Sequence, residues 1–211
     1  MRVNEIFYSI EGEGIRAGYP CVFVRFSGCN LDCSYCDTRY AKKREQGEEM
    51  TEQEIINKVL SYDCDKVTLT GGEPLLSLST DLLDRLLDED IEVNIETNGS
   101  INPVPYQFKN TIITMDYKLP SSGMEGRMVE RYIDELREQD VLKFVVGSDE
   151  DLERAKEVIE DHMIRAEVFF SPVFGQMDPK RMVDFLKKNR LGARLQLQLH
   201  KMIWNKNRRG V

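Results

Sequence analysis

The apolar positions of the chain follow two spacings. Short apolar runs predict strands, and apolar residues three or four positions apart predict helices between them. The predicted strands are residues 2–10, 21–26, 66–70, 91–96, 111–115, 141–146, 167–170 and 194–199. The predicted helices cover residues 81–88, 125–137, 149–161 and 179–188, and a further one starts at Thr51, which forms a capping box with Glu54. Residues 27–47 show no periodicity and are predicted as a long loop.

This alternation is typical of an α/β fold in which crossover helices join parallel strands. Polar and glycine-rich residues directly follow several predicted strands, and barrel-like α/β folds place their active sites at these strand ends. We therefore predict one domain over residues 1–211 with the form of a partial, open βα barrel. A doubly wound open sheet is the alternative, but the G-x-G-x-x-G turn that such sheets favour is absent.

Composition narrows the possible classes of protein. The chain of 211 residues carries 29 basic and 37 acidic residues, and a hydrophobic content of 41% excludes a disordered tail. No apolar run approaches the roughly 20 residues of a membrane span. The N-terminus has no signal-peptide pattern, so we expect a cytoplasmic protein with reduced thiols.

Charge is spread unevenly along the sequence. Residues 180–211 contain ten basic residues against one acidic residue, whereas the chain as a whole has a net charge of −8. A basic C-terminal segment suits an anionic ligand or forms a solvated helix face. The acidic remainder argues against direct binding of nucleic acid.

Three cysteines carry the strongest chemical signal. Cys29, Cys33 and Cys36 form a C-x3-C-x2-C motif. Because a [4Fe–4S] cube normally takes four cysteines, three would leave one iron open to a ligand. A structural zinc site would need a fourth donor. Candidates for that donor are Cys21, Cys64, His162 and His200, none of them in a second paired motif.

The cysteine motif, with Tyr35 before its last cysteine, resembles the signature of radical S-adenosylmethionine enzymes. The segment Gly71-Gly72-Glu73-Pro74 resembles their second signature. A wider pattern is similar to the 7-carboxy-7-deazaguanine synthase family and spans almost the whole chain. It comprises residues 9–14, 25–26, 36–38, 70, 96–99, 116–118 and 197–201.

This resemblance implies a lyase with a [4Fe–4S] cluster, S-adenosylmethionine and Mg²⁺. The reaction implied is conversion of 6-carboxy-5,6,7,8-tetrahydropterin to 7-carboxy-7-deazaguanine with loss of ammonia, in queuosine or archaeosine biosynthesis. Radical chemistry belongs to the cofactor, so no catalytic side chain is expected. The partners implied are an electron donor of the flavodoxin or ferredoxin type and a second copy in a homodimer.

The resemblance also assigns residues. Cys29, Cys33 and Cys36 would hold the cluster, and Thr38 would bind Mg²⁺ with Asp37 beside it. The expected contacts of S-adenosylmethionine are Gly72, Glu96, Asn98, Asp116, Tyr117 and Lys118. Those of the pterin are Ile10, Glu11, Gly12, Arg25, Thr70 and Val211.

Residue chemistry supports some of these assignments. Glycines leave the backbone open to close approach by a cofactor. An arginine at position 25, inside an apolar strand, needs a partner, which is either a substrate carboxylate or an internal salt bridge. Glu11 has the chemistry to accept two hydrogen bonds from an amino-pyrimidinone edge.

Two other functions fit the cysteine spacing. One is an activase that generates a glycyl radical on a protein, and the other is a non-catalytic zinc or iron–sulfur module. The segment 11–13, Arg25 and Thr38 favour a small pterin over a protein substrate.

Overall fold

The computed structural model describes all residues from 1 to 211, and its nine strands form one sheet. The strand order is β3 (Glu48–Glu49), β1 (Arg2–Ile10), β2 (Pro20–Phe26), β4 (Lys66–Gly71), β5 (Glu92–Thr97), β6 (Thr111–Tyr117), β7 (Val141–Val146), β8 (Glu167–Pro172) and β9 (Arg194–Leu195). Strand β2 and strands β4 to β9 pair in parallel, whereas β1 is antiparallel to both of its neighbours, β2 and β3. The end strands β3 and β9 do not pair with each other, so the predicted open α/β barrel is confirmed.

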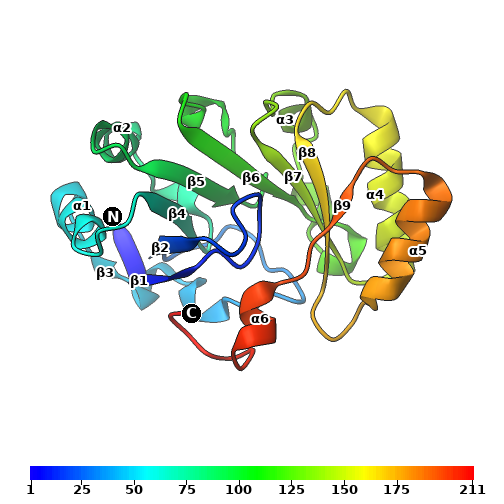
Figure 1. The fold of residues 1–211 in the computed structure, drawn as a ribbon, viewed down its shortest axis with the longest axis horizontal. Coiled ribbons are helices and arrows are strands. Elements are labelled where there is room, and N and C mark those ends of the chain that lie inside the picture. Colours follow the sequence, from blue (N-terminus) through cyan, green and yellow to red (C-terminus); the bar gives the residue numbers. More distant parts are fainter.

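Helices lie on the outer side of the curved sheet (Figure 1). They are α1 (Glu52–Leu60), α2 (Thr80–Asp88), α3 (Arg131–Asp134), α4 (Asp149–Asp161) and α5 (Pro179–Asn189). Helix α1 begins at the predicted capping box, in which the Thr51 hydroxyl accepts from the amide of Glu54 and the Glu54 carboxylate accepts from the amide of Thr51. Helix α6 (Leu199–Ile203) lies apart from these, across the opening between β1 and β9.

The two faces of the sheet differ in polarity because side chains alternate along each strand. On β5, Val93 and Ile95 pack into the core under the helices, and Asn94 and Glu96 face the concave side. The same alternation on β4, β6 and β7 puts threonine, aspartate and lysine side chains on the concave side. The inner face of the sheet is therefore the polar one.

Two predicted elements are wrong. Residues 125–137 form a 3-10 turn at Glu125–Arg127 and the short α3 instead of one helix. Beyond α3, Arg137 is held in a loop, where it donates to the carbonyls of Phe108 and Thr111.

The last predicted strand is also shorter than expected. Only Arg194–Leu195 pairs with β8, and α6 begins at Leu199. The backbone amide of Gln196 still donates to the Phe170 carbonyl of β8 at 2.9 Å, while its side chain bonds to the backbone of Gly14 at 2.8 and 3.0 Å. No helix is long and apolar enough to cross a membrane.

A pair of leucine substitutions tests the assignment of the core. Leu86 in α2 is fully buried, whereas Leu60 in α1 is 41% exposed. We expect Leu86→Ala to lower the free energy of unfolding by about 2–5 kcal/mol, because it leaves a cavity. Leu60→Ala should cost about 1 kcal/mol or less. Urea unfolding followed by circular dichroism measures both, and equal losses would contradict this packing.

Candidate active site

Two adjoining cavities open on the concave side of the sheet. The first, which we call the cysteine cavity, has a volume of about 230 Å³ and lies between the cysteine loop and the ends of β4 to β7. The second, the tail cavity, has about 450 Å³ and lies between β1, β2, α6 and the C-terminal residues. Arg25, Thr38, Thr70, Glu96 and His200 line both cavities, so the two form one site.

Most of the predicted residues lie in this site. The cysteine cavity is lined by Cys29, Cys33, Cys36, Thr38, Gly72, Glu96, Asn98, Asp116 and Lys118. The tail cavity is lined by Ile10, Glu11, Gly12, Arg25, Thr70 and Val211. Arg25 and Thr70 from the predicted substrate set and Glu96 from the predicted cofactor set line both cavities, so the two predicted sets meet where the cavities join.

Tyr117 is the exception among the predicted residues. Since Asp116 and Lys118 face the cavity, strand alternation turns Tyr117 to the opposite face. Its ring is buried in the core, and its hydroxyl donates to Glu130 at 2.8 Å. The Tyr117 side chain is therefore not part of the cavity.

The cysteine loop packs directly on the glycine turn after β4. The Gly72 amide donates to the Phe26 carbonyl at 3.0 Å, and the Glu73 amide donates to the Gly28 carbonyl at 2.8 Å. A Cβ on Gly72 would lie 2.3 Å from the Gly28 oxygen, and Gly71 has a φ of +142°. These glycines are thus required by backbone packing, in addition to any cofactor contact.

The three thiols fit an iron–sulfur cluster by their chemistry. All are half-buried and free, and they share one wall of the cavity. Burial raises the pKa of Cys29 and Cys33, and the negative charge of the neighbouring cysteines adds to this effect. Soft thiolate donors suit an iron–sulfur cluster, as they also suit zinc and Cu(I). No three His, Cys, Asp or Glu side chains are grouped so as to hold a single metal ion.

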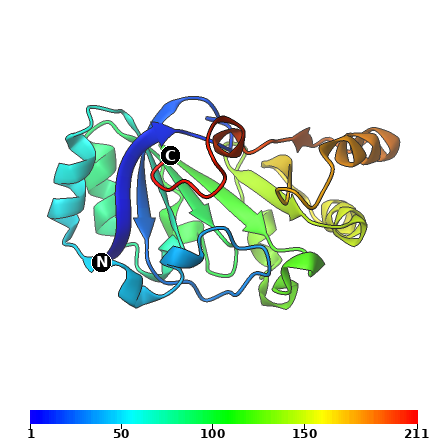
Figure 2. The ribbon, with the colours of Figure 1, turned by 90° about the horizontal axis from the view of Figure 1, so that it is seen from below.

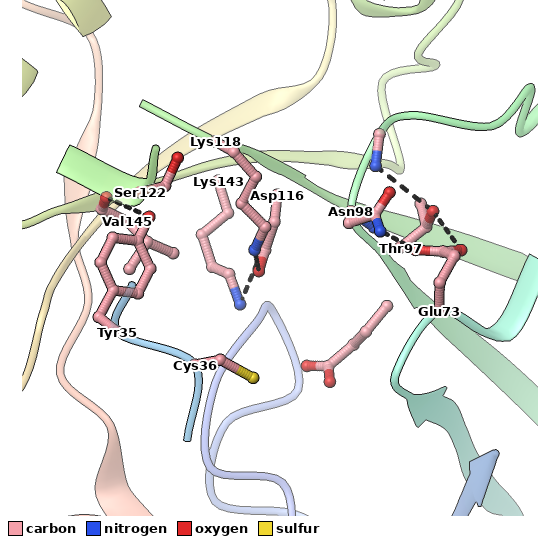
Figure 3. A network of polar contacts seen from close by, with 12 residues as sticks. Tyr35, Cys36, Glu73, Thr97, Asn98, Asp116, Lys118, Ser122, Lys143 and Val145 are labelled. Carbon is pink, nitrogen blue, oxygen red and sulfur yellow. Dashed lines mark hydrogen bonds and ion pairs between the residues drawn. The ribbon is translucent and has the colours of Figure 1, made fainter. Parts of the chain in front are cut away.

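Glu73 fixes the end of β5, a role that the sequence did not reveal. Its buried carboxylate accepts from the Asn98 amide at 2.7 Å and the Thr97 hydroxyl at 2.8 Å (Figure 3). Burial raises the pKa of Glu73 to about 7. The Asn98 side chain in turn donates to Asn30 at 3.0 Å, which connects β5 to the cysteine loop.

A buried charge network joins the end of β6 to the middle of β7. Asp116 pairs with Lys118 and Lys143, each at 2.9 Å (Figure 3). Lys143 also pairs with Glu13 at 2.9 Å. Burial alone would raise the pKa values of Glu13 and Asp116, but the lysines hold both below their usual range. The sequence analysis did not include Lys143 among the site residues. A single lysine within the apolar strand Val141–Val146 could have indicated it.

In the tail cavity, two of the predicted pterin residues already have partners. The Glu11 Oε2 atom accepts from Arg16 at 3.3 Å and from the Thr68 hydroxyl. The Arg25 Nε donates to Glu5 at 2.8 Å, which is the internal salt bridge that the sequence left open.

The remaining contacts join the tail cavity to the cysteine loop. The Thr70 hydroxyl donates to Glu96 at 2.9 Å, and burial raises the pKa of Glu96 to about 7. Thr38 lies with its hydroxyl 3.7 Å from the Cys36 sulfur, and the neighbouring Asp37 pairs with Lys201 at 2.5 Å.

Comparison with known proteins identifies the superfamily of this fold. The sequence profile of the Radical SAM superfamily matches residues 23–109. The structure is similar to the crystal structure of QueE from Escherichia coli, with a TM-score of 0.74, 22% identity and 94% of both chains covered. A second neighbour is the structure of TYW1 with a lysine-pyruvate adduct, with a TM-score of 0.57 and 11% identity over 80% of this chain and 72% of that one. The chain is a radical SAM enzyme, a class that uses a [4Fe–4S] cluster and S-adenosylmethionine.

Relatives in sequence narrow this class to one family. A 7-carboxy-7-deazaguanine synthase from Clostridium acetobutylicum is 46% identical, with 100% of this chain and 99% of the relative covered. Synthases of the same name from Chlorobaculum tepidum and Methanospirillum hungatei are 43% and 42% identical, covering 100% and 96% of this chain and 97% and 85% of the relatives. The chain belongs to the 7-carboxy-7-deazaguanine synthase family, which favours the synthase over the activase and the zinc module.

The packing of Gly72 leads to a test. Gly72→Ala should push the cysteine loop off the glycine turn, because the new methyl group meets the Gly28 carbonyl. We expect less iron and sulfide per chain after anaerobic reconstitution. Gly126→Ala is the control, since nothing lies within 4 Å of its Cβ position. Full iron loading of Gly72→Ala would show that the loop does not depend on this contact.

Proposed function

We propose that this protein converts 6-carboxy-5,6,7,8-tetrahydropterin to 7-carboxy-7-deazaguanine with release of ammonia, as a step in 7-deazapurine biosynthesis. The observation that carries the proposal is the joined pair of cavities, one lined by three thiols and the other by Glu11 and the C-terminal residues, with Arg25 shared by both. The whole-length similarity to synthases named for this product supports it.

The cysteine cavity would take the cluster and S-adenosylmethionine, which would supply radical chemistry there. Cys29, Cys33 and Cys36 would hold the cluster. Gly72, Glu96, Asn98, Asp116 and Lys118 would bind S-adenosylmethionine, whose amino and carboxylate groups suit a wall with both charges. Tyr117 contributes only its backbone to this set, since its side chain lies in the core.

The tail cavity would take the pterin. Arg25 uses its Nε for Glu5, so its two terminal nitrogens are left for a bidentate contact with the substrate carboxylate. Glu11 has Oε2 engaged, which leaves Oε1 for the amino-pyrimidinone edge. Thr70 would add a hydroxyl, Ile10 and Gly12 would add backbone groups, and Val211 would close the far wall.

We further propose that Mg²⁺ binds at Thr38 and bridges to the substrate. Magnesium takes hard oxygen ligands and keeps several waters, so one hydroxyl together with substrate oxygens is a sufficient set. Thr38 lines both cavities, which is where such a bridge has to lie. Asp37 is engaged by Lys201 and would act next to the ion, not on it.

The proposal includes partners and a compartment. A cytoplasmic carrier of the flavodoxin or ferredoxin type would supply the electron, and the working form would be a homodimer. Five free cysteines suit a reducing compartment.

The reaction itself is tested by anaerobic incubation of cluster-loaded protein with S-adenosylmethionine, Mg²⁺, a reductant and the carboxy-tetrahydropterin. We expect the ultraviolet spectrum of a deazaguanine and one ammonia per product. Cys33→Ala should lose both cluster and product, while Cys64→Ala, a cysteine outside the site, should keep both. Product formation by Cys33→Ala would refute the cofactor assignment.

The magnesium site has its own test. Thr38→Ala should raise the Mg²⁺ concentration needed for half-maximal rate, because the ion loses a protein ligand. Thr38→Ser keeps the hydroxyl and should behave as the wild type. If the Mg²⁺ dependence is the same in all three proteins, Thr38 is not the ligand.

A further inference from the structure

The segment after α6, residues 204–211, folds back over the N-terminal strands. We call it the tail. In Figure 2 the tail (red) turns from α6 toward β1 and β2. Its residues from Lys206 to Val211 line the tail cavity together with Arg25 and Thr38. The tail therefore forms a wall of the cavity in which we place the substrate.

One tail residue holds this segment in place. The Arg209 guanidinium donates to the Asn4 side chain at 2.8 Å and lies 3.7 Å from the Glu5 carboxylate. It also lies over the Tyr40 ring, 4.0 Å from the ring centroid. A cation over an aromatic face is attracted by the ring, which adds to the ion pair. Arg209 is thus a latch onto three residues of the protein body.

The partner of this latch is also the partner of Arg25. Glu5 is largely buried, with 16% of its side chain exposed. Its Oε1 accepts from the Arg25 Nε at 2.8 Å and from the Tyr40 hydroxyl at 3.0 Å, while its Oε2 faces Arg209. Burial raises the pKa of Tyr40, so its hydroxyl keeps the proton that it donates. A single carboxylate therefore sets both the Arg25 side chain and the tail.

The charges in this group favour an anion. Two guanidinium groups share the Glu5 carboxylate, so these three side chains together carry one positive charge, which the nearby Asp37 carboxylate offsets only in part because Asp37 is paired with Lys201. The Arg25 terminal nitrogens have no hydrogen bond to the protein that would compete with a ligand carboxylate. The positive charges of Arg25 and Arg209 repel each other. An anion bound at Arg25 would offset this repulsion and would therefore stabilise the contacts of Arg209 with Glu5 and Tyr40.

We propose that the tail is a substrate-coupled strap, in which Glu5 is the positioning residue that joins tail closure to the orientation of Arg25. This inference rests on the proposed function for the identity of the anion, the carboxylate of a reduced pterin. The latch itself, Arg209 on Glu5 and Tyr40, does not depend on that identity.

The test uses the cluster-loaded protein and the isosteric change Glu5→Gln. Hydrogen exchange of the tail amides, measured without ligand, should become about tenfold faster, because the tail loses the ion pair between Arg209 and Glu5. With the carboxy-tetrahydropterin, KM should rise about tenfold while kcat stays within about threefold, since Arg25 is misaligned for binding and not for chemistry. Arg209→Met should show the same faster exchange of the tail amides. Arg209→Lys keeps the positive charge and should regain part of the wild-type protection against exchange.

Arg208→Met is the matched control. It removes a charge from the same tail, but the Arg208 side chain makes no hydrogen bond or ion pair that would anchor it. Its tail exchange should therefore equal that of the wild type. Equal acceleration by Arg208→Met and Arg209→Met would mean that tail charge matters and the latch does not, which overturns the proposal.

The two proposals fail in different ways. If the wild type does not turn over the pterin, the proposed function is wrong, and the ligand-free exchange of Glu5→Gln still decides the latch. If the wild type turns it over but Glu5→Gln changes neither exchange nor KM, the strap is wrong and the function stands. Faster exchange with an unchanged KM would retain the latch and overturn its coupling to Arg25.

Discussion

The site depends on a place where two backbone segments touch with no side chain between them. The loop that carries the cysteines lies on the turn after β4, and Gly28, Gly71 and Gly72 make this approach possible. Hydrogen bonds from the Gly72 and Glu73 amides then fix the loop against β2 and β4. The depth of the three thiols relative to the strand ends follows from this contact. Eight residues of irregular chain that carry the three cysteines are thereby anchored to the sheet at their first residue.

The second constraint is the balance of buried charge. Glu13, Glu96 and Asp116 face Lys118 and Lys143 on a largely buried wall of the cavity, where an unpaired charge is unfavourable. Lys143 connects Asp116 at the end of β6 to Glu13 in the N-terminal loop. These pairs orient the charged groups on this wall, which would suit the zwitterionic cofactor that we propose for it.

The sequence predicted the α/β class and the open barrel because strand spacing and strand-end motifs are local features. The expected cavity residues were found largely because parallel strands bring their ends to one edge. Glu5, Glu73 and Lys143 escaped prediction, since their roles come from pairing across the fold and each looks like an ordinary charge in the sequence. The orientation of Tyr117 away from the cavity could have been predicted, because a strand that turns residues 116 and 118 inward must turn the residue between them outward. The false helix at 125–137 fitted the local pattern, but tertiary bonds of Arg137 overrode it.

An open sheet leaves one side of its interior without a strand, and radical chemistry requires that water be excluded there. Here the two ends of the chain close that side together. The Leu199 amide donates to the Gly12 carbonyl at 3.0 Å, and the Gln198 side chain donates to Glu13 at 2.6 Å. A Cβ on Gly12 would lie 2.2 Å from the His200 ring, so α6 approaches the N-terminal loop as closely as the backbone allows. Because Glu13 is also the partner of Lys143, this closure is joined to the charge network of the cofactor wall. In place of the missing strands of the barrel, the contact between α6 and the N-terminal loop closes this side of the site. Through Glu13, the same contact is connected to the buried charges of the cavity.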